Sequence, residues 1–362
     1  PCAGQLVPQM FRMDADGANI HQITRSTVHE NEPSLMPDGR ILYNRWDYVD
    51  RNFGDGHGFW VANPDGTNQA IIWGNNTAHP ASPWTARAIP GTGTFICILG
   101  THHGSLGGAL AIINPQIAVD GRKSIERTWP QDVIKRFDSP SKMSIPKGRG
   151  KLRGIEKMTS IWPAEARCLL PESHDYRLHG WNDNLNSVKP WYNCPFPINS
   201  TQFLFVVAPN RRIGAEIRLG DVKGSEVKIH AEKPGCYDPM PLAPHPKPVV
   251  MSSTRDYGDK DGHFYIQNVY IGTHTKRVKP GSVKSIRVVQ AHSKRGKSGH
   301  IWRALGHQEG AIGWSGFIAK TVLGTAPMAK DCSAAVYGPS SRFLFFPLLL
   351  SLLLLLPSLL PL

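Results

Sequence analysis

The chain has 362 residues, with 41 Lys and Arg against 28 Asp and Glu and a formal net charge of +13. Its 35 Gly and 30 Pro interrupt most windows of a dozen residues, which excludes a long helical bundle. Because 40% of the residues are apolar and only 19% are charged, the chain is not a disordered polyampholyte. Frequent turn residues between short apolar runs are typical of an all-β protein.

An internal repeat begins near the N-terminus. Residues 10–20 (MFRMDADGANI) and 58–68 (GFWVANPDGTN) both contain an apolar run, then Asp or Asn with Asp-Gly, then a polar residue. Looser copies lie at 109–122 and 217–227. Asp-Gly favours a tight turn, because Gly accepts a positive φ and the Asp side chain caps the turn. Each copy therefore predicts a hairpin.

The repeat has a second half, in which a strand and a polar loop precede an acidic or polar residue followed by Pro. The three instances are Glu32-Pro33, His79-Pro80 and Asp238-Pro239. Runs such as RILYN, TFICIL and QFLFVV have the composition of strands. Four short strands in a unit of about 40–50 residues are typical of a β-propeller blade. We predict an all-β fold: an incomplete β-propeller of 4–6 blades followed by a small β-rich segment.

The predicted blades occupy residues 1–245. Within them, residues 122–190 are basic, rich in Pro and Gly and aperiodic, so they are either an inserted loop or a region damaged by a frame error. Alternating runs at 263–273 and 281–291 predict strands. They place a β-rich extension at residues 246–337.

Residues 338–362 form an apolar tail dominated by Leu and Pro. The uncharged stretch from Phe343 to the end is long enough to cross a bilayer, but three prolines interrupt it. Two interpretations stay open: a membrane or lipid-anchor segment, and an artefactual stretch translated from the wrong frame. The composition favours the second. Membrane contact is expected only if the tail is genuine.

Positive charge is concentrated in two segments. Residues 122–157 hold eleven Lys and Arg and four acids, and residues 276–303 hold nine Lys and Arg and no acid. No nucleic-acid motif accompanies them, and aromatic residues do not interleave at a stacking spacing. The pattern predicts a solvated basic face or an acidic protein partner, and no nucleic-acid binding.

The repeats resemble the PD40 repeats of TolB-like propellers. A closer resemblance, over residues 10–120 and 190–337, is to the hydrazine synthase alpha subunit middle-domain family. It rests on segments such as PSLMPDGRILYNRWDYVDRNFGDGHGFWVANPDGTNQ, CYDPMPLAPHPKP and FYIQNVYIGTHTKRVKPGSVKSIRVV. It is absent over about 122–188 and after Tyr337.

The resemblance implies an exported, periplasmic bacterial protein. In the family's enzyme, an oxidoreductase, the propeller sits beside c-type haem domains in a complex that makes hydrazine from nitric oxide and ammonium. This chain has no Cys-x-x-Cys-His, so c-type haem and zinc are expected only in the full-length family protein. We expect a scaffold and interaction domain that is not catalytic by itself, with a haem-carrying domain or partner subunits as its partners.

Two loops supply candidates for a ligand site, and no catalytic residue is assigned. One follows RILYN and ends in a Gly-rich stretch, and the other follows TFICIL. Loops at blade ends commonly carry binding residues, although the same residues also suit salt bridges or structural hydrogen bonds. The candidates for ligand binding or channel lining are Arg45, Trp46, Asp47, Asp55, His57, His102 and His103.

The six cysteines are far apart, without a Cys-x-x-Cys motif, which excludes a zinc ribbon. Their disulfide pairing stays open. The family's enzyme holds zinc between a propeller-side Cys and its haem region, and Cys236 is a candidate for that ligand. The alternative function is a stand-alone metal-binding propeller with hydrolase or lyase activity, which would require His and carboxylates to converge at the blade ends.

Overall fold

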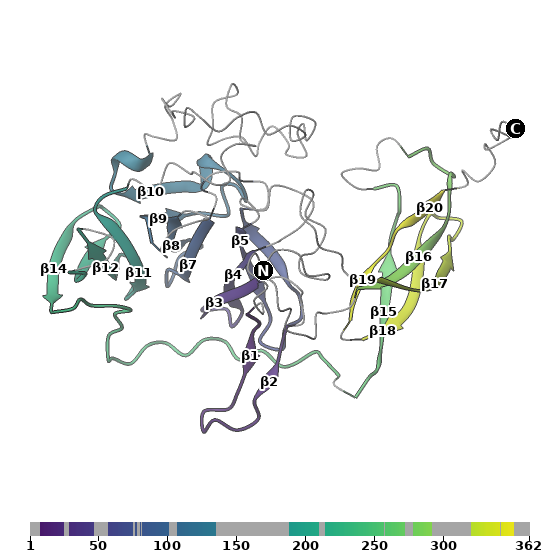
Figure 1. Cartoon of the computed structure of the whole chain (residues 1–362), viewed down its shortest axis with the longest axis horizontal. Helices are drawn as coiled ribbons and strands as arrows, with labels where there is room; N and C mark the ends of the chain where they lie inside the picture. Colours follow the sequence, from purple (N-terminus) through teal and green to yellow (C-terminus); the bar gives the residue numbers. More distant parts are fainter. Residues whose placement is uncertain are drawn as a thin grey trace, which may run out of the picture.

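The protein is described by a computed structural model. Its described residues are 8–24, 29–46, 57–74, 77, 80, 82–100, 107–134, 188–209, 214–256, 258–271, 278–291, 320–340 and 342–350. In these residues the assigned elements are β-strands and a short 3₁₀ helix, Arg122–Ser124, and residues 132–134 form a helical turn. Figure 1 shows several small sheets side by side, followed by a separate group of strands near the C-terminus.

Three four-stranded antiparallel sheets form successive blades. In each, the strands pair in chain order, so the blade is a simple meander. The first contains β3 (His29–Leu35), β4 (Ile41–Trp46), β5 (His57–Ala62) and β6 (Ala70–Trp73). The second contains β7 (Ser82–Ala88), β8 (Phe95–Gly100), β9 (Ala109–Ile113) and β10 (Ile125–Trp129). The third contains β11 (Trp191–Pro197), β12 (Gln202–Ala208), β13 (Glu216–Asp221) and β14 (Glu226–Ala231).

The sequence repeats coincide with the outer hairpins of the blades. The copies at 58–68, 109–122 and 217–227 fall on β5–β6, β9–β10 and β13–β14. The copy at 10–20 falls on a separate two-stranded sheet, β1 (Phe11–Arg12) and β2 (His21–Gln22). The prediction of an all-β, propeller-like fold is confirmed. The described residues contain three full blades and this additional hairpin.

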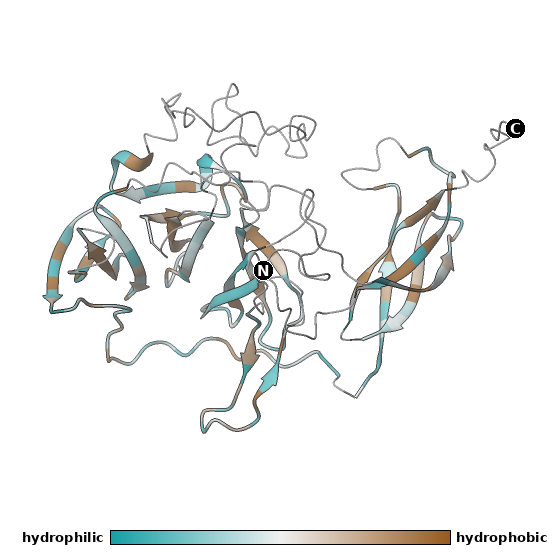
Figure 2. Ribbon diagram, viewed as in Figure 1, coloured by the Kyte–Doolittle hydropathy of each residue, from teal (hydrophilic) through white to brown (hydrophobic). Residues whose placement is uncertain are grey.

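Neighbouring blades pack through aromatic and aliphatic side chains. Figure 2 shows that strands of the blades carry stretches of hydrophobic residues. Phe59 of the first blade meets Phe95 of the second edge to face, with ring centroids 5.3 Å apart. Trp129 of the second blade meets Phe203 of the third at the same centroid distance, 5.3 Å. Cys97 is fully buried in the first of these interfaces. Since stacking covers the apolar faces of adjacent sheets, each blade depends on its neighbour for its core.

After β14 the chain runs without strands through residues 232–256, which we call the return segment, back to the first blade. The Val249 N–H donates to Pro37 O at 3.1 Å. Asp65, in the tight turn between β5 and β6, accepts hydrogen bonds at Oδ2 from Thr254 N (2.8 Å) and Ser253 Oγ (3.1 Å). The return segment therefore ties residues after the third blade to the first.

A second group of strands follows. β15 (Asp261–Ile266) pairs with β18 (Ala334–Pro339), while β16 (Val283–Ala291) pairs with β17 (Lys320–Pro327), β19 (Phe343–Phe345) and β20 (Leu348–Leu350). Their small core includes Val269, Val283, Ile286 and Ala334. Of these strands, β15 overlaps the alternating run at 263–273 and β16 lies within the run at 281–291.

The first part of the apolar tail belongs to this core. Strands β19 and β20 lie inside the segment 338–362, which the sequence set apart as a tail, and both pair with β16. Phe346 packs on Phe264, with ring centroids 5.2 Å apart, and Leu348 contacts the same core. No helix in the described part of the chain is long and apolar enough to cross a membrane. Residues 351–362 lie outside the described residues.

Candidate functional site

Two of the predicted ligand residues, Trp46 and His57, meet at one end of the first blade, whereas Arg45 contacts a different ring. Trp46, at the end of β4, stacks between His29 and His57, with ring centroids 4.9 and 5.0 Å away. His57 also meets the edge of Trp84 in the second blade at 5.0 Å. The Arg45 guanidinium lies 4.2 Å from the centroid of the Trp60 ring. Sequence reasoning missed His29 and Trp84, which are distant in sequence from the predicted loop.

This arrangement is an aromatic stack rather than a set of converging metal donors. Burial lowers the pKa of His29 to about 4, so its imidazole is neutral at pH 7. His57 is only 2% exposed. The other predicted ligand residues, Asp47, Asp55, His102 and His103, lie outside the described residues, as do large parts of both basic segments.

A second group of polar residues lies on β3, β7 and β11, the first strands of the three blades. We call these the inner strands, because they approach one another. The pairing register shifts inside β3, β7 and β11. At each shift one residue adopts a left-handed conformation: Glu32 (φ 52°), Thr85 (φ 51°) and Cys194 (φ 48°). Asp238 of the return segment repeats it with φ 47°. Non-glycine residues rarely adopt this conformation, so its recurrence marks equivalent positions in four consecutive units.

These positions correct the pattern drawn from the sequence. Glu32 and Asp238 do occupy equivalent places, each followed by Pro. In the second blade the equivalent residue is Thr85 rather than the expected His79, which lies outside the described residues. The third, Cys194, was missed although Pro195 follows it.

Side chains connect the left-handed residues of successive units. Glu32 Oε2 accepts a hydrogen bond from the backbone N–H of Thr85 at 2.5 Å. The Cys194 thiol lies beside the backbone of Asp238 and the hydroxyl of Tyr237, and both groups oppose the effect of burial on its pKa. In both cases a side chain at one position contacts the backbone at the next. The inner-strand cluster consists of Glu32, Thr85, Arg87, Cys194, Tyr237 and Asp238.

The electrostatics of this cluster stabilise contacts between its residues and do not produce a reactive side chain. Burial raises the pKa of Glu32, although hydrogen bonds from Thr85 and the charge of Arg87 oppose the rise. Burial also raises the pKa of the Cys194 thiol, which therefore stays protonated at pH 7 and is a weak nucleophile. Arg87 Nη2 lies 3.8 Å from Asp238 Oδ1, and its guanidinium lies over the Phe196 ring. The cluster can align the blades around their common centre.

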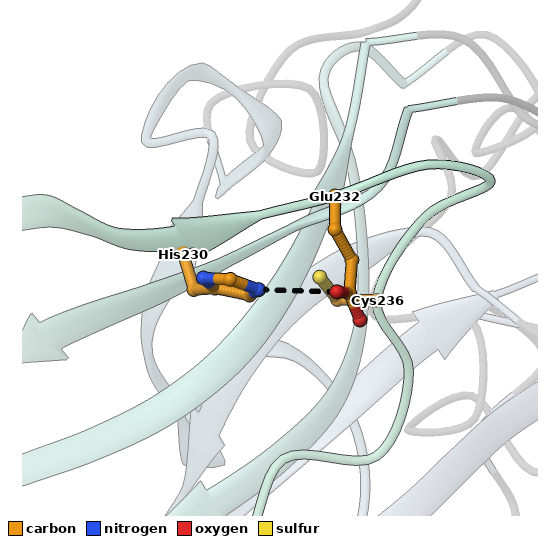
Figure 3. Close-up of side chains that lie close together, drawn as sticks. All are labelled: His230, Glu232 and Cys236. Carbon is orange, nitrogen blue, oxygen red and sulfur yellow. Dashed lines mark ion pairs between the residues drawn. The ribbon is translucent and has the colours of Figure 1, made fainter.

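The third group is a metal-donor cluster formed by His230, Glu232 and Cys236 (Figure 3). The donor atoms of the three side chains all lie within 4.8 Å of one another. His230 Nε2 is 3.6 Å from Glu232 Oε2. Cys236 is buried, whereas the other two residues are exposed. Cys236 was predicted as a metal ligand, but its two neighbours were not, although all three lie within one short stretch of sequence.

Comparison with known proteins supports the family resemblance. Residues 281–351 match the family described as the hydrazine synthase alpha subunit middle domain. This match extends past Tyr337, where the sequence resemblance was expected to end. The resemblance to the hydrazine synthase alpha family is thus confirmed. No curated protein sequence matches the chain.

The structure is also similar to that of hydrazine synthase from Kuenenia stuttgartiensis. The TM-score is 0.61 and the sequence identity is 15%, over 91% of this chain and 41% of the other. At this identity the likeness shows a shared fold. The present chain spans less than half of the solved chain that it matches.

Proposed function

We propose that this chain is a propeller scaffold of an exported, hydrazine-synthase-alpha-like protein, and that it binds a haem-carrying domain or partner subunit. The observation that carries the proposal is the family match at residues 281–351, in a chain whose fold resembles hydrazine synthase over 91% of its length. The chain itself has no Cys-x-x-Cys-His for covalent haem attachment. Any c-type haem would therefore be carried outside these 362 residues.

The third blade offers a surface suited to such a partner. One face of its sheet packs on the second blade through Phe203, Phe205 and Val207. On β14, Val227 and Ile229 are 58% and 54% exposed. Val227 pairs with Leu219 of β13, which in turn pairs with a residue of β12 that alternates with those packed on the second blade. Val227 therefore lies on the face of the sheet that points away from the second blade. Apolar residues on a sheet face are typical of interaction surfaces.

The described blade ends favour a scaffold over the alternative of metal-dependent hydrolysis or lyase chemistry. A hydrolytic metal site would need His and carboxylate donors that converge on an open position. Among the described residues of the first blade, the rings of His29 and His57 instead stack on Trp46. Stacked aromatic rings rigidify this end of the blade.

The test is haem recovery with the protein purified from the organism that carries its gene. We expect a haem-containing polypeptide to co-purify in a fixed ratio, measured by haem absorbance and native mass spectrometry. Ile229→Lys should release it, because a charge would be buried in the contact. Val249→Lys, at a similarly exposed position of the return segment, should retain it. Recovery of the chain without haem, or equal haem in both variants, would overturn the proposal.

Export is part of the same proposal and is tested separately. The family resemblance implies a periplasmic protein. Protease added to spheroplasts should therefore degrade the protein while a cytoplasmic marker survives. Degradation only after membrane lysis would contradict an exported location.

A further inference from the structure

Strands β15 and β18 form a two-stranded antiparallel ribbon with two unlike faces (Figure 1). One face packs into the small C-terminal core, where Phe264 lies against Phe346 with ring centroids 5.2 Å apart. Along β15, exposed and half-buried residues alternate strictly. Because successive side chains of a strand point to opposite faces, Asp261, His263 and Tyr265 share the face that points to solvent.

The partner strand completes an aromatic surface on this exposed face. Tyr337 of β18 lies opposite His263, and the two rings stack with centroids 4.6 Å apart and planes 9° from parallel. In the next row, about 7 Å along the strands, Tyr265 lies opposite Ala335. The small Ala335 leaves a notch that the rings of Tyr265 and Tyr337 border on two sides. We call His263, Tyr265, Ala335 and Tyr337 the aromatic platform.

The two tyrosines of the platform are largely open to solvent. Tyr265 is 63% exposed and Tyr337 is 78% exposed. Their hydroxyls and the imidazole of His263 can hydrogen-bond to a ligand. A Tyr ring also offers a large, rigid contact area with few torsions to immobilise on binding. Exposed apolar rings that carry polar tips are therefore suited to recognition.

The size of the platform favours a narrow ligand over a protein partner. Each of the two strands has six residues, so the face measures about 20 by 10 Å. Its area is on the order of 200 Å², whereas a standard protein interface buries about 800 Å² on each partner. A single extended chain of small rings fits along this face.

The charge of the platform decides between three such ligands. Asp261 is the only charged residue in the two strands, and Asp259 lies at the same end, where its carbonyl accepts a hydrogen bond from Ser340 Oγ at 2.9 Å. Carboxylates repel a nucleic acid, whose bases would otherwise suit stacking. The prolines of a proline-rich peptide have no N–H to donate to a carboxylate.

Sugar chemistry matches both features of this face. The hydroxyl groups of a sugar donate hydrogen bonds to carboxylates, which are strong acceptors. The C–H bonds on one face of a sugar ring carry partial positive charge and meet the negative face of an aromatic ring. An uncharged sugar chain also avoids repulsion by Asp261.

We propose that the aromatic platform binds a neutral polysaccharide. One sugar ring lies over Ala335 and stacks on Tyr265 and Tyr337. The chain of sugars continues along the strands toward Asp261, whose carboxylate accepts hydrogen bonds from sugar hydroxyls. The site is separate from the exposed face of β14 and does not depend on the haem-carrying partner proposed above.

Binding of neutral oligosaccharides to the purified 362-residue chain tests the proposal. The probes are oligomers of glucose, N-acetylglucosamine, mannose and xylose, first immobilised and then measured in solution by calorimetry. Tyr265→Ala and Tyr337→Ala should each raise the Kd by about tenfold or more, as expected for an aromatic anchor. Tyr337→Phe keeps the stacking ring and should raise it far less. The control is Phe11→Ala, at a ring of β1 that is 60% exposed, which should bind as the wild type does.

A second variant leaves every ring of the platform in place. Ala335→Leu fills the notch and should abolish binding, while circular dichroism and the Tm without sugar stay unchanged. Ala335→Ser, which keeps the notch open, should still bind. Failure of the wild-type chain to bind any of the oligosaccharides, or equal binding by Ala335→Leu, would refute the proposal. Binding of poly-L-proline or single-stranded DNA at the platform in place of sugar would also refute it, in favour of a peptide or a nucleic acid.

Discussion

The Glu32 carboxylate accepts a hydrogen bond from the Thr85 backbone N–H at 2.5 Å, and thereby joins two left-handed residues in consecutive blades. Two blades further on, Cys194 and Asp238 are again left-handed residues of consecutive units, and the Cys194 thiol lies beside the Asp238 backbone. In each case a side chain that points away from its own strand, because of the bulge, reaches the neighbouring unit. Irregular residues of the inner strands thus make specific connections between blades that regular strand pairing cannot make.

The pH dependence of Glu32 provides the first prediction. Its pKa is higher in the folded than in the unfolded chain because of burial, so the folded state holds its proton more tightly. Its contribution to stability is present below the unfolded pKa and is lost as pH rises through the folded pKa. Glu32→Gln should therefore gain stability relative to wild type as pH rises above 4.5, the ordinary pKa of the group, as measured by urea unfolding. Glu126→Gln, at an exposed position, should show no such gain. A pH-independent difference for Glu32→Gln would contradict this account.

Asp65 has the opposite behaviour. Burial raises its pKa, but hydrogen bonds from Thr67, Thr254 and Ser253 outweigh burial and lower the pKa to about 2. Its contribution to stability is present above the unfolded pKa and is lost as pH falls through the folded pKa. Asp65→Asn should lower the free energy of unfolding by about 1–3 kcal/mol at pH 7. The deficit should shrink between pH 4 and 2.

The equivalent turn of the first repeat supplies the control for Asp65. Asp16 makes the same local hydrogen bond, to Ala18 N at 2.9 Å, but is exposed. Asp16→Asn should change stability far less than Asp65→Asn. Limited proteolysis should also cut the return segment faster in Asp65→Asn alone. Equal effects of the two substitutions would show that the local turn, rather than the return segment, determines the stability.

Two glycines in these turns form a matched pair. Gly17 (φ 85°) and Gly66 (φ 80°) are both left-handed, and alanine at either position costs about 1 kcal/mol through backbone strain. A Cβ on Gly17 would meet nothing within 4 Å, whereas one on Gly66 would overlap Ile23 O. Gly66→Ala should therefore destabilise the protein by at least about 2 kcal/mol more than Gly17→Ala. Equal Tm values for the two variants would exclude this contact.

Truncation tests the role of the apolar segment. A chain that ends after Arg342 lacks β19 and β20, so amide exchange in β16 should accelerate because its hydrogen-bond partners are gone. A chain that ends after Leu350 should keep wild-type protection. Phe346→Ala, at a half-buried ring against Phe264, should cost about 1–3 kcal/mol, less than a fully buried Phe. Unchanged amide exchange in the chain that ends after Arg342 would show that this segment does not pair with β16.

Local turn chemistry explains what the sequence could predict. The Asp-Gly turns specify hairpins within about a dozen residues, and the repeat of that pattern predicted the blade architecture. Metal coordination by Cys236 was proposed from a family resemblance. The two further donors that the structure adds, a His and a Glu, lie within six residues of that Cys in the sequence, so their spacing could have indicated them. The sequence does not show, however, that the chain turns back after the exposed end of β14 and brings Cys236 close to these two residues.

Long-range features could not be predicted in this way. The inner-strand bulge of the second blade uses Thr85-Ala86, without the Pro that marks Glu32 and Asp238. The contact between Asp65 and Thr254 spans 189 positions. For the segment after Phe343, the apolar composition with its prolines was interpreted as a membrane or lipid-anchor segment or, preferably, as an artefact, whereas its first part forms two short strands separated by Pro347. Apolar composition indicates that a segment must be buried, but it does not indicate which surface of the protein buries it.

The return segment also determines how mechanical load passes through the molecule. Tension applied to strands β15–β20 acts on residues 249–255, and the hydrogen bonds of Val249 and Thr254 pass it directly to the first blade. The second blade and most of the third lie outside this path. A force that separates the C-terminal strands from the blades must first break the bonds at Pro37 and Asp65. Until it does, the stacked aromatic interfaces between blades bear little load.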